Sequence, residues 1–398
     1  MALFEIKIVP SEKESVILAE SNFGEATIQV PNVFLEEMIN KSEQLRESHK
    51  KPDLCNLKEE MINFGIRLFS GIIKGDILTL FNRTIGGSLE GQLDIRLMLG
   101  KAKLNAIQWE LMHYRKEYIG FRHNFVRHPF VARPANIPQR ERKKLRVLAV
   151  CVDPLFGESG IHEEHQNLCE ILQGYGDSIN FTSLYQEEAT LDNIKDCLFE
   201  GVDIWHFTGH GHFNSKDIIE SYLLTWGRSS RDTGLLSIRT LATLAVSQSI
   251  GFCYLNACNT ARESISKNKI TLNETQGDSL VNMAHGLIEA GAPLVVATNH
   301  EITIWAATVF SRRFYKSIIK YGNRVDQAVR QGRAELYIDS ERGYAGDWSS
   351  PVLYGRSQYM GLGLEALEWR ESFDLFRVRN VEKPVLHETA PEEDQIIL

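Results

Sequence analysis

Long apolar runs and internal repeats are absent from this sequence. No stretch reaches the ~18 consecutive apolar residues that a membrane-spanning helix needs. The amino terminus, MALFEIKIVPSEKE, lacks a charged start followed by a long apolar core, so it does not resemble a secretory signal. No segment recurs at a fixed period, which argues against a solenoid. These absences predict a cytoplasmic protein without a membrane segment.

Cysteine is scarce, and a basic excess is missing. The six cysteines lie far apart and form no CxxC pair: Cys55, Cys151, Cys169, Cys197, Cys253 and Cys258. This pattern is unlike that of a disulfide scaffold, so each thiol is expected to be reduced, and either buried or reactive. The formal net charge of −8 argues against direct binding of nucleic acid. We interpret the one basic cluster, within residues 140–146, as a solvated linker.

The chain divides near residue 140. Pro129, Pro134 and Pro138 precede that point, and closely spaced proline excludes a regular helix, so we place a linker there. Four units are predicted. An N-terminal strand plus helical region (1–92) precedes an upstream half with the linker (93–140), and a main domain (141–360) is followed by an extension with an acidic tail (361–398).

The main domain alternates between short apolar runs and segments of helical periodicity. Five buried strands are predicted, at residues 145–151, 179–184, 203–208, 251–256 and 293–298. Helices are predicted at residues 163–173, 191–199, 235–245, 278–290 and 303–320. Alternation at these lengths predicts an α/β fold in which a parallel sheet is flanked by helices.

Two polar turns are expected after neighbouring strands of this sheet. HFTGHGHF (206–213) follows the third strand, and LNACNTA (255–261) follows the fourth. Ligands bind beyond the carboxyl ends of such strands, which lie about 4.8 Å apart, so His210 and Cys258 are expected to meet. Only a thiolate attacks, and a histidine titrates near neutral pH, so the pair suits a nucleophile and its general base. Taken singly, such a cysteine is usually a buried apolar group and such a histidine a turn residue.

Glycines on both sides of His210 fit the same chemistry. Gly209 and Gly211 allow a tight turn and leave backbone N–H groups to face a developing oxyanion. The 48 residues from His210 to Cys258 also match the roughly 50 between the histidine and cysteine of caspases.

The same turn offers a metal site as an alternative. His206, His210 and His212 form an H-x₃-H-x-H set, and imidazole is a usual zinc ligand. No acidic residue within the turn completes the set, since the nearest are Asp203 and Asp217. A metal-dependent hydrolase is therefore the less favoured hypothesis.

Several segments resemble the CHAT family of caspase-like cysteine peptidases. WHFTGHGHF is similar to the family's histidine motif and YLNACNTA to its cysteine motif, and WSSPVLYG is similar to its closing strand. The likeness covers most of residues 93–360. It implies a caspase-like sheet with a degenerate caspase-like upstream half. It also implies that His210 is the base and Cys258 the nucleophile, with the oxyanion held by the backbone N–H groups of Gly211 and Cys258.

The resemblance further implies a reaction and its partners. Peptide hydrolysis would pass through a Cys258 thioester without a cofactor, as limited proteolysis of a specific protein substrate under a regulatory or activating partner. The expected setting is microbial signalling, antiviral defence or cell death. The alternative from another class is a non-catalytic caspase-like interaction scaffold.

Two residues are expected at the substrate pocket. In caspase-like enzymes the residue two before the nucleophile lines this pocket, which here is Asn256, a neutral amide. The family commonly has an Asp after the fifth strand, and Glu301 stands near that place, where it could instead favour a helix dipole. A neutral or weakly basic preference is therefore predicted, with no cleavage after Asp.

Overall fold

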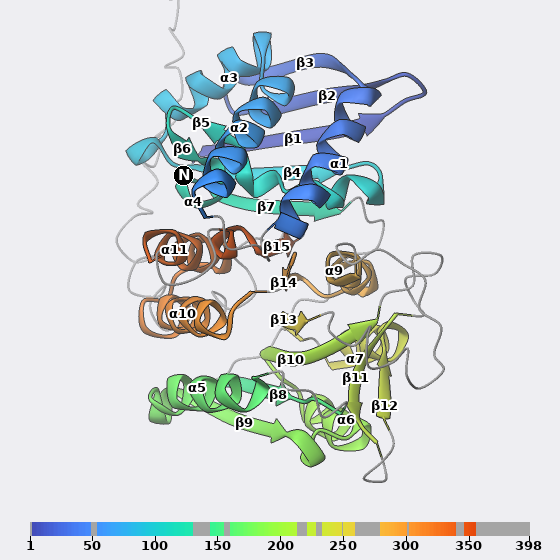
Figure 1. The fold of residues 1–398 in the computed structure, drawn as a ribbon. Helices are drawn as coiled ribbons and strands as arrows, with labels where there is room; N and C mark the ends of the chain where they lie inside the picture. Colours follow the sequence, from blue (N-terminus) through green and yellow to red (C-terminus); the bar gives the residue numbers. More distant parts are fainter. Residues whose placement is uncertain are drawn as a thin grey trace, which may run out of the picture.

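Nearly all strands of the protein join one mixed sheet, as Figure 1 shows for the computed structural model. The structure describes residues 2–48, 54–129, 144–154, 160–212, 221–227, 233–248, 250–258, 279–300, 302–339 and 346–355. Across the sheet the strands are β9 (Ile179–Tyr185), β8 (Leu145–Cys151), β10 (Ile204–His212), β13 (Phe252–Cys258), β14 (Leu294–Thr298), β15 (Pro351–Gly355), β7 (Asn124–Pro129), β4 (Leu93–Leu99), β1 (Ala2–Pro10), β2 (Glu14–Ser21) and β3 (Gly24–Pro31). At its carboxyl end β10 also pairs with the hairpin of β11 (Tyr222–Trp226) and β12 (Thr233–Ser237).

The sheet contains two parallel blocks. The first runs from β9 to β14, and the second comprises β7, β4 and β1. β15 joins them, because it is antiparallel to β14 and parallel to β7. The predicted parallel, helix-flanked sheet is thus confirmed in these blocks. It is corrected at β15, at the β1–β2–β3 edge and at the hairpin of β11 and β12, where neighbouring strands are antiparallel.

Helices cover both faces of the main block (Figure 1). One face packs against α5 (Ile161–Gln173), α10 (Ile304–Tyr315) and α11 (Val325–Ile338). The other packs against α6 (Leu191–Glu200), α7 (Ile238–Gln248) and α9 (Ser279–Ala290). Side chains along β10 alternate between these two layers, since Ile204 joins the first core and Trp205 and Phe207 the second. The apolar runs seen in the sequence are therefore strands buried on both faces.

The chain before residue 130, which comprises the N-terminal region and the upstream half, is richer in structure than predicted. Its helices are α1 (Asn32–Ser48), α2 (Leu54–Ile72), α3 (Gly75–Gly86) and α4 (Ile119–Arg122). β2 and β3 were not predicted, because their outward residues stay partly exposed and blur the apolar pattern. A second difference lies in the main domain, where the predicted helix 235–245 begins as β12 and becomes α7 only at Ile238.

Candidate active site

The two expected catalytic residues occupy paired positions on adjacent parallel strands. In the register of β10 and β13, Thr208 faces Asn256 and His210 faces Cys258. The structure describes Cys258 through its backbone, as the last residue of β13. Neighbouring strands are about 4.8 Å apart. The prediction that the two positions come together is therefore confirmed at the level of the backbone.

His210 lies within a strand and not in the turn that the sequence indicated. β10 continues to His212, and Gly209 keeps its neighbour β8 close. A Cβ added at Gly209 would lie 2.7 Å from the carbonyl oxygen of Val152. The glycine is thus required by a close approach of two backbones, and the predicted tight turn is wrong at this position.

An acidic residue that the sequence analysis overlooked contacts the histidine. Asp153 follows β8, and the preceding Val152 N–H still donates to the Thr208 carbonyl (2.9 Å), which keeps the chain beside β10. Asp153 Oδ1 lies 3.1 Å from His210 Nε2, and both side chains are buried. The Asp153 N–H donates to Gln186 Oε1 (3.0 Å), which holds this corner in place. Asp153, His210 and Cys258 therefore form one row across three strands. A carboxylate directly after a buried strand was the available signal.

His206 lies one pleat deeper on β10, and both of its ring nitrogens have protein partners. Its Nδ1 is 2.8 Å from the Tyr315 hydroxyl and its Nε2 is 3.3 Å from Thr208 Oγ1. Its ring also packs on Tyr254, with 4.3 Å between ring centroids. Burial lowers the pKa of the His206 ring to about 3, so this histidine is neutral at physiological pH.

The metal alternative gains no support from this geometry. Within the described part of the chain, no three His, Cys, Asp or Glu side chains gather closely enough to hold a metal ion. His206 and His210 have the separate protein contacts given above. The side chain of His212 lies outside what the structure describes.

A second overlooked carboxylate touches the expected pocket residue. Glu164, on the first turns of α5, accepts hydrogen bonds at Oε1 from Thr208 Oγ1 (3.1 Å) and from Asn256 Nδ2. Glu164 lies beside the sheet with only part of its surface exposed, and burial raises the pKa of its carboxyl to about 7, against the effect of both hydrogen bonds. The expected pocket residue Asn256 is thus bound to an acid that lies far from it in the sequence.

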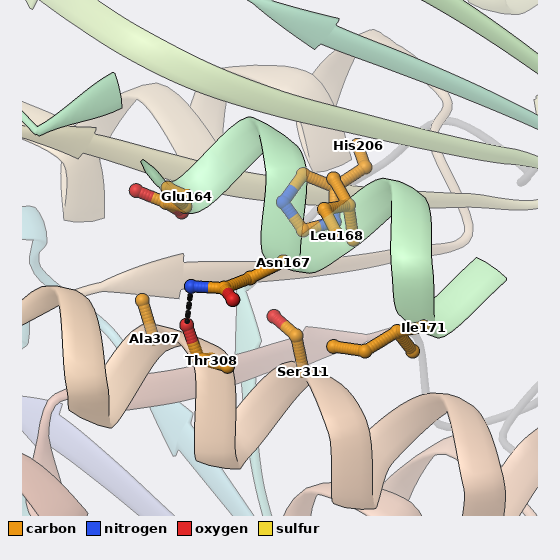
Figure 2. Close-up of a pocket in the computed structure, with 8 residues that line it drawn as sticks. All are labelled: Glu164, Asn167, Leu168, Ile171, His206, Ala307, Thr308 and Ser311. Atoms are coloured by element: carbon orange, nitrogen blue, oxygen red, sulfur yellow. Dashed lines mark hydrogen bonds between the residues drawn. The ribbon is translucent and has the colours of Figure 1, made fainter. Parts of the chain in front are cut away.

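A narrow crevice lies beneath Glu164, between α5 and α10 (Figure 2). Asn167, Thr308 and Ser311 line it, and Asn167 Nδ2 donates to Thr308 Oγ1 across it (3.0 Å). The crevice has no room for a water molecule. The two helices are therefore closed against each other below the site.

The remaining expected residues are only partly placed. Gly211 lies in β10 opposite Leu223 of β11. Glu301 lies outside the described residues. Close to it, Thr303 caps α10, since its Oγ1 accepts from the Ala306 N–H (3.1 Å). In the described ranges, no helix combines the length and hydropathy that crossing a bilayer requires.

Solved structures of several cysteine peptidases are distantly similar to this chain. Gingipain R, an Arg-specific cysteine proteinase, is 12% identical over 82% of this chain and 74% of its own, with a TM-score of 0.42. The complex of pro- and mature domains of RgpB from Porphyromonas gingivalis is 12% identical over 83% of this chain and 78% of that one (TM-score 0.43). The Saccharomyces cerevisiae separase of a separase–securin complex is 11% identical and 89% of this chain aligns with it (TM-score 0.48).

The chain spans only 30% of that separase. A search among curated protein sequences found no match. The model of the CHAT domain matches residues 80–356. Because this match covers well over half of the sequence and includes both motifs, the protein belongs to the CHAT domain family.

Proposed function

We propose that this protein is a cysteine endopeptidase in which Cys258 is the nucleophile and His210 the general base. The observation that carries the proposal is the register of β10 and β13, which pairs these two positions at the carboxyl edge of a parallel block. Membership of the CHAT domain family supports a peptide bond as the substrate, and a protein partner as its source.

The proposed reaction uses groups of this chain alone and needs no cofactor. His210 takes the thiol proton, and the Cys258 sulfur attacks the peptide carbonyl carbon. The resulting oxyanion faces the N–H groups of Gly211 and Cys258. As the C–N bond breaks, His210 returns the proton to the leaving amine. Water then hydrolyses the thioester, again with His210 as base, and releases the new carboxyl terminus.

We assign Asp153 as the residue that positions His210. Its carboxylate lies at Nε2, so Nδ1 is the nitrogen that exchanges the proton with Cys258 in this proposal. A carboxylate at this distance stabilises the imidazolium that forms after proton transfer. Asp153 acts through the histidine and has no contact with the peptide.

The proposal is tested by seeking new protein termini. Purified wild-type protein and Cys258→Ala protein are each incubated with cell lysate, and new amino termini are sequenced. We expect a small set of cleavages, in keeping with limited proteolysis, that disappears in Cys258→Ala and in His210→Ala. Both variants should keep the wild-type circular dichroism spectrum. Cleavage that persists in Cys258→Ala would overturn the assignment, and loss of cleavage on chelation alone would favour the metal alternative.

A thiol probe separates the peptidase from the scaffold alternative. Limited iodoacetamide treatment followed by peptide mass spectrometry reports the rate at each cysteine. We expect Cys258 to react at least tenfold faster than Cys169 and Cys197, the thiols of which are partly exposed and have raised pKa values because of burial. His210→Ala should remove that advantage. Equal rates at all three cysteines would support the scaffold.

A further inference from the structure

Glu164 is a largely buried carboxylate held by neutral donors. The hydroxyl of Thr208 and the amide of Asn256 both donate to its Oε1. Among the described residues no Lys or Arg forms an ion pair with it, and the groups that interact with it electrostatically are Cys151 and Tyr254. The crevice beneath it admits no water, so no solvent shell replaces the missing cation on that side. A buried charge without an opposite charge is costly to maintain.

The hydrogen bonds around Glu164 nevertheless favour its ionised carboxylate, because each of them points a proton toward it. Because Thr208 gives its only proton to Glu164, it must accept the Nε2 proton of His206 (3.3 Å). His206 Nδ1 then accepts the hydroxyl proton of Tyr315 (2.8 Å). The chain from Tyr315 through His206 and Thr208 thus directs each proton toward the Glu164 carboxylate. Such a chain strengthens the terminal bond.

The two residues that hold Glu164 lie one pleat before the proposed catalytic pair on the same two strands. Thr208 and Asn256 form the register pair two residues before the pair of His210 and Cys258. Two residues along a strand span about 7 Å. This spacing along the strands is comparable to the length of an extended lysine or arginine side chain. The side chains of Thr208 and Asn256 carry hydrogen-bonding groups but no charge of their own.

We infer that Glu164 is the acidic base of the substrate pocket, and that the protein cleaves after lysine or arginine. The inference rests on the proposed function and names the substrate class of the same site. A cationic side chain would supply the opposite charge that Glu164 lacks, whereas a neutral one would leave the carboxylate buried and unpaired. Asp153, the other acid of the site, is engaged by His210 (3.1 Å). The preference expected from Asn256 alone is thereby revised from neutral to basic.

The test uses tripeptidyl acyloxymethyl ketones that differ only in the residue bound in this pocket: lysine, arginine, aspartate or norleucine, which has a four-carbon chain like lysine but no charge. Rates of covalent labelling are measured on the full-length protein, with Cys258→Ala as the control for site. We expect the lysine and arginine probes to label at least about 100-fold faster than norleucine, because a buried polar group is left unpaired by the neutral probe. The aspartate probe should not label.

Glu164→Gln keeps the size of the side chain and an acceptor for Thr208 and Asn256, and should reduce the lysine-to-norleucine ratio to below about fivefold. Glu163→Gln, one residue earlier and exposed, is the matched control and should keep the wild-type ratio. If Glu164→Gln does not fold, the ratio in the wild-type protein still decides the question. Cys258-dependent labelling with equal lysine and norleucine rates would refute the pocket and leave the peptidase intact. Absence of Cys258-dependent labelling by every probe would refute both.

Discussion

Two carboxylates, one in each half of the molecule, have different neighbours: Glu110 is fully buried and Glu164 is partly exposed. Glu110 in the upstream half is 3.1 Å from Arg127 Nε and 2.5 Å from its Nη2, and Arg333 Nη2 lies 3.6 Å away. Both arginines also donate to backbone carbonyls. Glu164 in the main domain has two neutral donors and, among the described residues, no cation. The Glu110 carboxylate is neutralised within the fold by two arginines, whereas the described residues place no positive charge beside Glu164.

The difference separates a charge that the fold neutralises from the charge that we assign to the substrate pocket. Arg127 stands opposite Tyr354 in the single register pair that joins β7 to β15, so the Glu110 group stabilises the junction of the two halves. Glu164 lies beside the carboxyl edge of the main block, close to the proposed catalytic row. The strand ends of the upstream block offer no comparable pair, since His128 faces Met98 in the register. We therefore interpret Glu110, which arginines neutralise, as structural, and Glu164, which neutral donors hold, as a candidate for binding a cation.

Removal of Arg127 from the Glu110 ion pair should have the largest effect on stability. Arg127→Met should lower the free energy of unfolding by about 3–5 kcal/mol, because Glu110 would keep its charge while losing its closest partner. Urea unfolding followed by tryptophan fluorescence measures this. Arg67→Met is the control, since its pair with Glu37 is exposed and should be worth less than about 1 kcal/mol. A loss as small as the control would mean that Glu110 is not held by Arg127.

Removal of the His206 ring should have the next largest effect on the free energy of unfolding. His206→Ala should cost about 2–4 kcal/mol, because it leaves a cavity between Tyr254 and Tyr315 and removes a hydrogen-bond partner of Tyr315. The pKa of His206 is lowered in the folded state, so its contribution is complete above about pH 6.5 and is lost as the pH falls toward about 3. Urea unfolding at pH 7.5 and pH 4.5 measures both effects, and the His206→Ala deficit should shrink at the lower pH. An undiminished deficit at pH 4.5 would contradict a neutral, buried His206.

Removal of the Glu164 charge should raise the free energy of unfolding, whereas the two preceding substitutions lower it. Glu164→Gln should raise the free energy of unfolding by on the order of 2 kcal/mol at pH 8, since the pKa of Glu164 is raised to about 7 in the folded state. The charged form is disfavoured by folding, so the penalty grows as the pH rises from about 4.5 through about 7. The gain should therefore fall below about 1 kcal/mol at pH 5. Glu163→Gln should change neither value, and a variant destabilised at pH 8 would show that Glu164 resembles Glu110.

The smallest effect on stability is expected at the third acid, Asp153. Asp153→Asn should change the free energy of unfolding by less than about 1 kcal/mol, because the amide retains an acceptor for His210 and the Gln186 contact to its backbone N–H is untouched. Turnover should fall about tenfold or more, with KM little changed, because the group acts on the imidazolium formed during reaction. Measurement of kcat and KM on a cleaved peptide distinguishes this from a structural role, which would lower stability and activity together.

Sequence patterns were sufficient for the order of strands and helices in the main domain and for the pairing of His210 with Cys258. Each of these depends on local periodicity, or on motifs that follow strands predicted one after the other. Glu164 and Asp153 were missed because their roles depend on which helix packs over β10 and how far β8 extends beside it. Those contacts join residues far apart in sequence, as Asn256 and Glu164 are. The helix predicted at residues 235–245 is confirmed from Ile238 onward, and its first three residues belong to β12 because an apolar run fits either periodicity and these residues pair with β11.

The row of Asp153, His210 and Cys258 is assembled from three segments of chain that lie tens of residues apart. A shift of one residue in the pairing of β10 and β13 would turn alternate side chains to the opposite face of the sheet. Parallel pairings between distant segments also form slowly during folding. A newly made chain would therefore carry both reactive groups and yet cut nothing. In the proposed mechanism, proteolysis begins only when the sheet is complete and in register.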